Sequence, residues 1–400
     1  MTEPHDDISP DSARLSVSLT MIVRNEEANL SACLESVRDL FDEIIVVDTG
    51  STDKTIEIAR SFGAKVVSFD WVDDFAAARN VTIEHASGDY LFWLDADETL
   101  DKENRDRLRT LLAGLRRKEA IYIMRQSSDL GGPSGSALLV EQVRLFPSGP
   151  KARWTGRLHE QILPAYWGSA KIHWTDVVIT HNGFSDPKVV DRKTDRDLRI
   201  VLAEVEAEPD SVSARRNLSR FFASRGDGEA ALEQIHACLS LLPPQHPGRF
   251  ELYAISVQAH LAIENLEAAH ALCQEALGQQ PDDAEILSFQ GSILYKMKDY
   301  DGAAASWRRI LGLQRPQRFL KLTTGFYSHE TRRNLAALAV ERGNYREAFQ
   351  LYTEIIAECP RDKTAVAYRS WIARKLLASW FVSPVSAVAG LFRLARPTPS

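Results

Sequence analysis

The chain has 400 residues, of which 44% are hydrophobic and 26% are charged, a balance typical of a soluble globular protein with two or three domains. Its 48 Lys and Arg against 55 Asp and Glu give a net charge of −7, which argues against a protein that binds nucleic acid through general phosphate contacts. The four cysteines are scattered, which argues against a disulfide framework and a structural zinc site. Reduced thiols and an N-terminus without a signal-peptide pattern favour a cytoplasmic location.

The first half of the chain has the pattern of an α/β domain. Residues 1–14 are polar, and we expect them to form a disordered lead-in. From residue 15, the apolar runs VSLTMIV, EIIVVD, KVVSF and YLFWL alternate with amphipathic stretches, which predicts βαβ units around a buried, mostly parallel sheet. We expect Gly63 and Gly88 to end two of the helices in the left-handed conformation. AIYIMRQ and LLVEQVRLF predict two further strands, so we assign residues 15–205 to this domain.

Helical, Ala- and Leu-rich sequence follows in residues 206–375 and repeats itself. A bulky residue, an alanine and a second bulky residue recur at fixed spacing, at Tyr300, Ala303 and Trp307, at Leu266, Ala269 and Cys273, at Tyr345, Ala348 and Tyr352, and more weakly at Ala231 and Ile235. The step of 34 residues from Ala269 to Ala303 is that of a tetratricopeptide repeat. We therefore predict an all-α tetratricopeptide-type solenoid of about four repeats, which either binds a partner in its concave groove or serves as a structural stack or dimer face.

Residues 376–400 form an apolar and basic tail. The run 376–392 carries no charged side chain and contains Pro384, and at about 1.5 Å per helical residue it is shorter than the ~30 Å hydrocarbon core of a bilayer. The last 40 residues have a net charge of +6. Two interpretations stay open, because such a tail can lie against the anionic inner face of a membrane or pack as a final helix on the repeats.

Polar side chains follow three of the predicted strands at the point where each strand ends. RNEE follows the first strand, DTGSTD ends the second, and DADE follows YLFWL. Because a parallel α/β sheet binds its ligands at the carboxyl ends of its strands, these segments predict one shared site. We predict that Asp48 contacts the ligand, whereas Asp53 either does so or caps the next helix.

Asp95 and Asp97 form the most specific local motif for a ligand site in this domain. Alternate residues of an extended segment point to the same side, and two carboxylates there can hold a divalent cation and a sugar hydroxyl. Mg²⁺ or Mn²⁺ keeps coordination positions that phosphate oxygens can fill, which neutralises charge on a diphosphate leaving group. We therefore predict Mg²⁺ or Mn²⁺ as the cofactor.

Four motifs, TMIVRNEEANL, IIVVDTGSTDKT, DDFAAARN and GDYLFWLDADE, resemble in order and spacing those of family 2 glycosyltransferases with the GT-A fold, in the subgroup that carries tetratricopeptide repeats. The resemblance covers residues 16–200 and the repeats. It implies a Rossmann-like GT-A domain that transfers a sugar, usually with inversion, from a nucleoside diphosphate donor, with a UDP-sugar favoured. The acceptor would be a protein, peptide or glycan recruited by the repeats.

The resemblance also implies roles for single residues. Asn25, Glu26 and Asp48 would contact the base and ribose, and Arg79 would face the donor, together with Asp95. Many relatives have two adjacent acids where this chain has Asp48 followed by a threonine, which makes the base contact less certain.

WTGRLHEQI resembles the Arg-x-His-Glu segment of the same subgroup. It makes Glu160 the predicted base, because inverting transfer needs a carboxylate that takes the proton of the acceptor. The alternative is that Glu160 and His159 form a buried hydrogen-bonded pair that shapes the acceptor pocket.

Three more residues are candidates for contacts to the metal or the diphosphate. His181 follows an apolar strand, and the family pattern makes it a metal ligand beside Asp97, although a lone histidine is more often structural. Lys193 and Arg196 are three residues apart on one predicted helix face and would reach the diphosphate, or else lie on a solvated face.

The leading hypothesis is thus a metal-dependent, inverting glycosyltransferase. The alternative is a noncatalytic repeat-based scaffold with a relic nucleotide-sugar-binding domain, and the joint presence of Asp95, Asp97 and Glu160 argues against it. A nucleotidyltransferase would need a Gly-rich, basic loop after the first strand, where this chain has RNEEANL.

Overall fold

The structure, a computed structural model, describes part of the chain in two compact units. Described are residues 14–116, 119–130, 136–162, 166, 168, 170–182, 187–318 and 321–391, with the backbone alone for 187–194 and 378–391. The predicted lead-in lies outside these residues, except for Arg14. The first unit runs to Asp129 and includes Ala137–Leu218 and Gln317–Leu322, and the second holds the rest.

A mixed sheet forms the centre of the first unit, with the strand order β3-β2-β1-β4-β7-β6-β8-β5 and β9 beside β7. The strands are β1 (Val17–Val23), β2 (Glu43–Asp48), β3 (Lys65–Ser68), β4 (Tyr90–Trp93), β5 (Glu98–Thr99), β6 (Ala120–Asp129), β7 (Ala137–Pro147), β8 (Lys171–His181) and β9 (Lys321–Thr323). β1 to β4 are parallel, as their apolar runs predict. β7 is antiparallel to β4 and β6, and β5 to β8.

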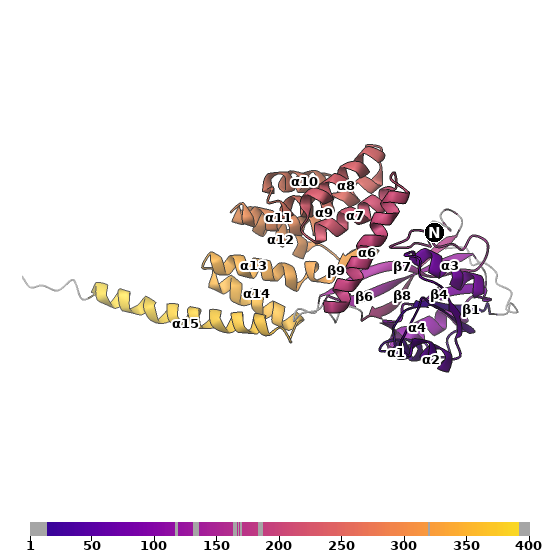
Figure 1. The fold of residues 1–400 in the computed structure, drawn as a ribbon. Coiled ribbons are helices and arrows are strands. Elements are labelled where there is room, and N and C mark those ends of the chain that lie inside the picture. Colours follow the sequence, from indigo (N-terminus) through magenta and orange to yellow (C-terminus); the bar gives the residue numbers. More distant parts are fainter. Residues whose placement is uncertain are drawn as a thin grey trace, which may run out of the picture. The chain divides into compact units, whose positions relative to one another are not determined.

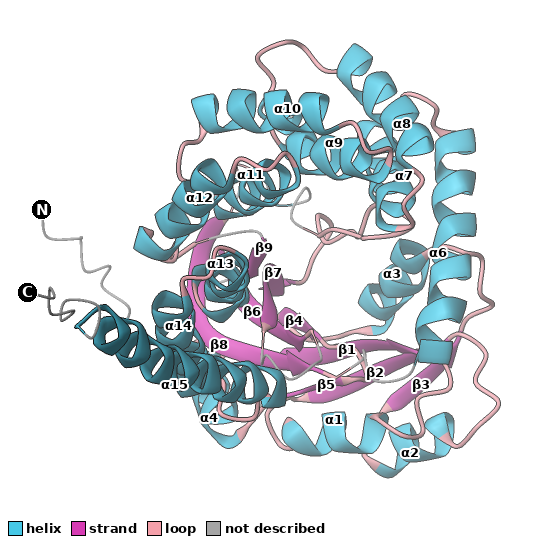
Figure 2. Cartoon of the chain, turned by 90° about the vertical axis from the view of Figure 1, so that its left-hand side faces the viewer, coloured by secondary structure: helices cyan, strands magenta, loops and turns pink. Residues whose placement is uncertain are grey.

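Helices cover both faces of the parallel part of this sheet. They are α1 (Leu30–Ser36), α2 (Thr55–Ser61), α3 (Phe75–His85) and α4 (Lys102–Ala113). A further helix, α6 (Pro187–Ala207), belongs to the same unit. Figure 2 shows α1, α2 and α4 on one face and α3 on the other. One core cluster packs Leu19 of β1 with Leu30 of α1 and Leu108 of α4, and a second packs Trp93 of β4 with Ala76 of α3. The result is a layered α/β domain.

Gly63 and Gly88 are glycines for two different structural reasons. Gly63 follows α2 with φ +78°, the left-handed conformation predicted for it. The same prediction is wrong for Gly88, whose φ is not in the positive range. A Cβ at Gly88 would overlap Ser18, so close approach of the two backbones requires a glycine there.

The second unit consists mainly of helices, which Figure 1 shows stacked in chain order. They are α8 (Gly228–Leu241), η1 (Pro247–Arg249), α9 (Glu251–Ala262), α10 (Leu266–Gln279), α11 (Ala284–Lys296), α12 (Tyr300–Gly312), η2 (Thr324–Tyr327), α13 (His329–Glu341), α14 (Tyr345–Glu358) and α15 (Lys363–Leu391). α7 (Val212–Ser224) precedes them at the boundary of the units. α9 pairs with α10, α11 with α12 and α13 with α14.

The repeat pattern found in the sequence marks the buried faces of these helices. Its alanines are fully buried, at Ala231, Ala269, Ala303 and Ala348. The bulky residue that follows each alanine is also buried, at Ile235, Cys273, Trp307 and Tyr352. Gly291 of α11 leaves room for the Trp307 ring of α12, which a Cβ would overlap. The prediction of an α/β domain followed by tetratricopeptide-type repeats is confirmed.

The final helix, α15, extends through most of the predicted tail. Its first part packs on α14, and Ala365 and Ile372 are fully buried there. The side chains of the apolar run from residue 378 onward lie outside the described residues, so both interpretations of the tail stay predictions. Within the described part of the chain, no helix combines the length and apolar character needed to cross a bilayer.

Candidate active site

The loops after β1 and β2 interlock at the carboxyl end of the sheet. The backbone N–H of Asn25 donates to Ser51 Oγ at 2.9 Å, and its side-chain Oδ1 accepts from the N–H of Thr52 at 2.8 Å. The N–H of Glu26 donates to Thr55 Oγ1 at 2.7 Å. Asn25 has a φ of +53°, a conformation that asparagine tolerates better than most residues. The two segments predicted to bind the base and ribose are therefore held together.

Asp48 ends β2, and its carboxylate shapes the loop that follows. Its Oδ2 accepts hydrogen bonds from the N–H groups of Gly50 and Ser51, both at 3.0 Å, and the residue is buried. Asp53 similarly accepts from the N–H of Thr55, the first residue of α2, at 3.0 Å. The N-cap residue of α2 is Lys54, so Asp53 bonds to the first residue of the helix from one position before the cap. The ligand contact of Asp48 stays a prediction.

Arg79 of α3 joins two of the predicted site carboxylates. Its Nη2 donates to Asp95 Oδ1 at 2.8 Å, and its Nε donates to Glu160 Oε1 at 2.5 Å. The Arg79 side chain is 5% exposed, against 35% for Asp95 and 13% for Glu160. His159 is exposed, which does not match the buried position that the alternative hypothesis assigns to it. The predicted base and a predicted donor ligand thus share one buried cation.

Aromatic rings and charges explain how Arg79 is accommodated. Its guanidinium carbon lies 4.4 Å from the centroid of the Trp93 ring and 5.2 Å from that of Trp154, within the range of cation–π contacts. Burial by itself lowers the pKa of Arg79, but the charges of Asp95 and Glu160 outweigh it and raise that pKa. Burial also raises the pKa of Asp95, but the charges of Arg79 and Arg144 together with the hydrogen bond from Arg79 outweigh burial and hold that pKa below its usual value. Asp95 is thereby kept as a carboxylate.

The two predicted metal ligands lie in contact. His181 Nε2 is 3.3 Å from Asp97 Oδ2, and His181 Nδ1 is 3.3 Å from Ser128 Oγ. The pairing of β5 with β8 places Glu98 opposite His181, which brings the DADE turn beside the end of β8. Burial by itself lowers the pKa of His181, but the hydrogen bond and charge of Asp97 raise it above its usual value.

Their side chains fit a metal ion that is shared with a ligand. Among the described residues, no three or more His, Cys, Asp and Glu side chains are arranged to hold a metal ion by themselves. Asp97 and His181 supply one carboxylate and one imidazole, fewer than the four ligands of a structural zinc site. Mg²⁺ and Mn²⁺ are commonly held by one or two protein ligands together with water and phosphate oxygens, which this pair allows.

A buried ion pair that the sequence analysis left unassigned lies next to Asp95. Arg144 of β7 and Glu98 of β5 have fully buried side chains, joined by two hydrogen bonds of 2.6 Å. The sequence does contain a signal for it, because Arg144 stands alone in the apolar run VRLF. A charge inside a buried strand has to be paired.

The basic residues predicted to reach the diphosphate lie on α6. The side chain of Lys193 lies outside the described residues. Arg196 donates from Nη2 to Asp197 Oδ1 at 2.7 Å, and its guanidinium carbon is 4.9 Å from the centroid of the Phe75 ring. Contact with a diphosphate stays a prediction for both residues.

Comparison with known proteins decides the family. A model described as "Glycosyl transferase family 2" matches residues 18–144, and a tetratricopeptide repeat model matches residues 256–317. A TPR repeat-containing protein of Synechococcus elongatus is 35% identical over 287 residues, which make up 68% of this chain and 68% of that protein. The chain belongs to glycosyltransferase family 2. It has a GT-A domain followed by tetratricopeptide repeats, as predicted.

This family 2 glycosyltransferase also resembles the glycosyltransferase SunS of Bacillus phage SPbeta, at 29% identity over 199 residues. The match covers 49% of this chain and 46% of SunS, so the chain spans about half the length of that relative. Among solved structures, that of TarS from S. aureus is similar with a TM-score of 0.39 and 14% identity, over 64% of this chain and 55% of TarS.

The family match ends before four of the glycosyltransferase's predicted site residues, Glu160, His181, Lys193 and Arg196. It contains the strand-end residues and Arg79 but stops at Arg144, ahead of Glu160 and His181. The structure brings these two to the others, since Glu160 contacts Arg79 and His181 contacts Asp97.

Proposed function

We propose that this glycosyltransferase moves a sugar, with inversion, from a nucleoside diphosphate sugar to an acceptor recruited by the helical repeats. The observation that carries the proposal is the contact of one guanidinium, that of Arg79, with both Asp95 and Glu160. The carboxylate that we assign to the donor side and the one that we assign as the base thus contact the same cation. A UDP-sugar is the favoured donor.

Asp95, Asp97 and His181 form the donor side in this proposal. Asp95 is a third exposed and is held as a carboxylate, so it can accept a hydrogen bond from a sugar or ribose hydroxyl. Asp97 and His181 would hold Mg²⁺ or Mn²⁺, which neutralises charge on the departing diphosphate when it is bound. The remaining donor contacts are assigned to the interlocked loops and to α6, at Asn25, Glu26, Asp48, Lys193 and Arg196.

Glu160 is the proposed base. As the acceptor atom attacks the anomeric carbon from the face opposite the diphosphate, the bond to the diphosphate breaks, the new glycosidic bond forms, and Glu160 takes the acceptor's proton. The 2.5 Å contact from Arg79 Nε fixes Oε1 of Glu160. Its second oxygen, Oε2, is the one we assign to the proton. Arg79 therefore acts on the donor through Asp95 and on the acceptor through Glu160.

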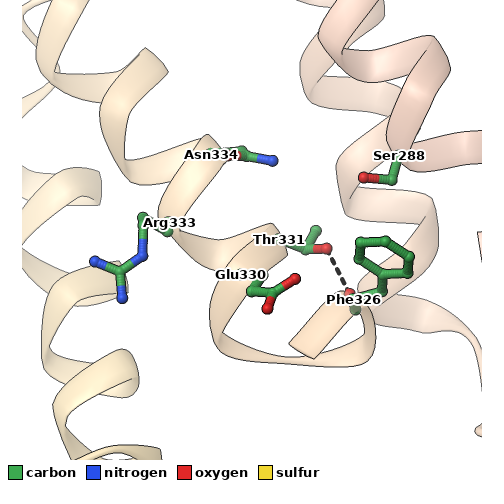
Figure 3. A pocket seen from close by; sticks show the side chains of 6 residues that line it. All are labelled: Ser288, Phe326, Glu330, Thr331, Arg333 and Asn334. Carbon is green, nitrogen blue, oxygen red and sulfur yellow. Dashed lines mark hydrogen bonds between the residues drawn. The ribbon is translucent and has the colours of Figure 1, made fainter. Parts of the chain in front are cut away.

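The repeats supply the recruiting surface in this proposal. The second unit has a cavity of about 220 Å³, shown in Figure 3, which is lined by Ser288, Phe326, Glu330, Thr331, Arg333 and Asn334. Its lining combines an aromatic ring with amide, hydroxyl and charged groups, which supports the binding of a protein, peptide or glycan acceptor.

We also propose a cytoplasmic location, with contact of the tail to the inner face of a membrane. All four cysteines lie in the described part of the chain, where none of them forms a disulfide bond and three are buried, which suits a reducing compartment. The contact of the tail rests on its charge and its apolar run.

The test is release of UDP from a panel of UDP-sugars by the full chain, with Mn²⁺ and with EDTA. We expect release from at least one UDP-sugar, lost with EDTA and in Glu160→Gln. In a parallel thermal-shift panel, a nucleoside diphosphate at 100 times its Kd should stabilise the protein by ~2.7 kcal/mol. A protein that shows neither release nor a shift with any nucleotide is the scaffold of the alternative hypothesis.

A further inference from the structure

Arg144 and Glu98 form an ion pair from which water is excluded. Both side chains are 0% exposed, and the two contacts, Nη1 to Oε2 and Nη2 to Oε1, are each 2.6 Å. Gln126 Nε2 donates to Glu98 Oε1 at 2.7 Å, and Arg144 Nη2 donates to Gln142 Oε1 at 2.7 Å. Because a well-packed apolar pair is often as stable as such a buried ion pair, stability alone does not account for it.

The pair holds the backbone on both sides of Asp95. Glu98 Oε2 accepts the N–H of Asp95 at 2.9 Å, and the N–H of Glu98 donates to the Asp95 carbonyl at 3.1 Å. Arg144 Nη1 donates to the carbonyl of Trp93, two residues earlier, at 3.4 Å. The Arg144 guanidinium carbon also lies 3.7 Å from the centroid of the Trp93 ring. The end of β4 and the turn after it are thus fixed by one bidentate contact.

Glu98 connects this turn to the strand that carries the second proposed metal ligand. It lies opposite His181 in the antiparallel pairing of β5 and β8, and the N–H of Asn182 donates to the Asp97 carbonyl at 2.9 Å. A change in the orientation of Glu98 would therefore move Asp95, Asp97 and His181 together. Arg79, by contrast, reaches only the Asp95 side chain in this turn.

We propose that Arg144 and Glu98 are positioning residues for glycosyl transfer, which hold the turn from Asp95 to Asp97 so that both carboxylates meet the donor. This inference rests on the proposed function. Neither residue touches the donor, because both are fully buried. They act through the main chain of Asp95 and through the pairing of β5.

The test compares two double variants that replace ion pairs of the same sheet by apolar side chains. In Arg144→Met/Glu98→Met the turn loses the side-chain contacts of both residues, while Arg125→Met/Glu141→Met removes the 3.3 Å, partly exposed pair between β6 and β7 as a control. Thermal unfolding, UDP binding with and without Mn²⁺, and kcat and KM for the UDP-sugar that the wild type uses are measured for each. We expect folded protein in both cases, and a loss of about 10- to 100-fold in Mn²⁺-dependent UDP affinity or kcat in the first variant alone.

Arg144→Lys keeps the charge and loses the bidentate contact, so it tests the inference even if the double variant fails to fold. We expect a smaller loss of Mn²⁺-dependent UDP affinity or kcat than in the double variant. Folded Arg144 variants with wild-type kcat, KM and UDP affinity overturn the positioning role and leave the proposed function standing. A wild-type protein that neither binds any nucleoside diphosphate nor releases one from its sugar contradicts the proposed function instead.

Discussion

Arg79 determines which charges of the site must be present together. A buried arginine keeps its positive charge, and removing one of its partners leaves charge without compensation. Asp95 and Glu160 therefore stabilise the same cation, and each is oriented by it. A substitution at either carboxylate should therefore also change the position of the other one, because both contact Arg79.

Replacing Glu160 by Gln tests the assignment of the base. The amide keeps the shape of the side chain and an oxygen for Arg79 Nε, but it cannot take the proton of the acceptor. We expect turnover to fall by ~10²- to 10⁴-fold, with little change in donor affinity. Steady-state kinetics and UDP titration of the variant measure both. A comparable loss of UDP affinity would place Glu160 in donor binding.

Asp97→Ala tests the metal assignment. Asp97 is 9% exposed and contacts His181, so its loss removes the carboxylate of the proposed metal pair and leaves the sheet intact. We expect Mn²⁺-dependent turnover to be abolished while the protein remains folded. Asp101→Ala is the control, because it removes the hydrogen bond to the N–H of Asn104 at the start of α4 and costs ~1 kcal/mol without touching the site. Sugar transfer that persists with Mn²⁺ would contradict the assignment.

The sequence predicts site residues next to strands better than it predicts their partners. Asp95 and Asp97 follow an apolar run, and their neighbourhood could be inferred from the end of a strand. The contact of Arg79 with Glu160 joins residues 81 positions apart. It depends on the path of the segment around Gly156 and His159, both at positive φ, which no periodicity encodes.

At the scale of elements, the sequence predicts long apolar strands and helical repeats, but it does not predict short strands that form only by pairing with a distant segment. β1, β2 and β4 are buried runs, and the alanines of the repeats recur at fixed spacing, so both follow from local patterns. β9 has three residues between helices, and its pairing with β7 is a tertiary contact. A strand of this kind leaves no periodic signal in the sequence.

The start of α13 carries a titratable group whose protonation should weaken the second unit. His329 is buried there, and its Nε2 lies 2.8 Å from Ser136 Oγ. Burial lowers the pKa of His329 below its usual 6.5, despite the opposing charges of Glu330 and Glu358. The unfolded chain then binds this proton more readily than the folded one, so stability falls as pH drops below about 6.5.

His329→Gln keeps a hydrogen-bonding group and removes the titration. We expect the melting temperature of the wild type to fall more steeply than that of the variant between about pH 7 and about pH 5. Thermal unfolding across this range gives both slopes, and at about pH 8 only a constant difference should separate the proteins. Parallel slopes would show that His329 does not contribute to the acid sensitivity.

At the scale of the whole molecule, the chain combines a domain with the proposed chemistry, a repeat unit that offers a surface, and a final helix. The first two follow from sequence because each fills a core of its own, whose residues recur in recognisable patterns. What the last helix contacts does not follow from its own sequence, because it can pack on α14 alone or on α14 and a lipid surface. Its described part already packs on α14 through Ala365 and Ile372.

Truncation after Lys375 tests whether the remaining part of this helix contacts a membrane. The uncharged run 376–392 is flanked by basic residues, and the last 40 residues carry a charge of +6. On anionic lipid, each nearby Lys or Arg contributes ~1 kcal/mol within a Debye length of ~8 to 10 Å, so binding should weaken sharply as salt is raised. We expect the full chain to co-sediment with anionic vesicles at low salt, less at high salt or with neutral vesicles, and the truncated chain to stay in the supernatant. Equal, negligible sedimentation of both chains would leave a helix packed on the repeats, and would favour a protein or peptide over a lipid-linked glycan as the acceptor.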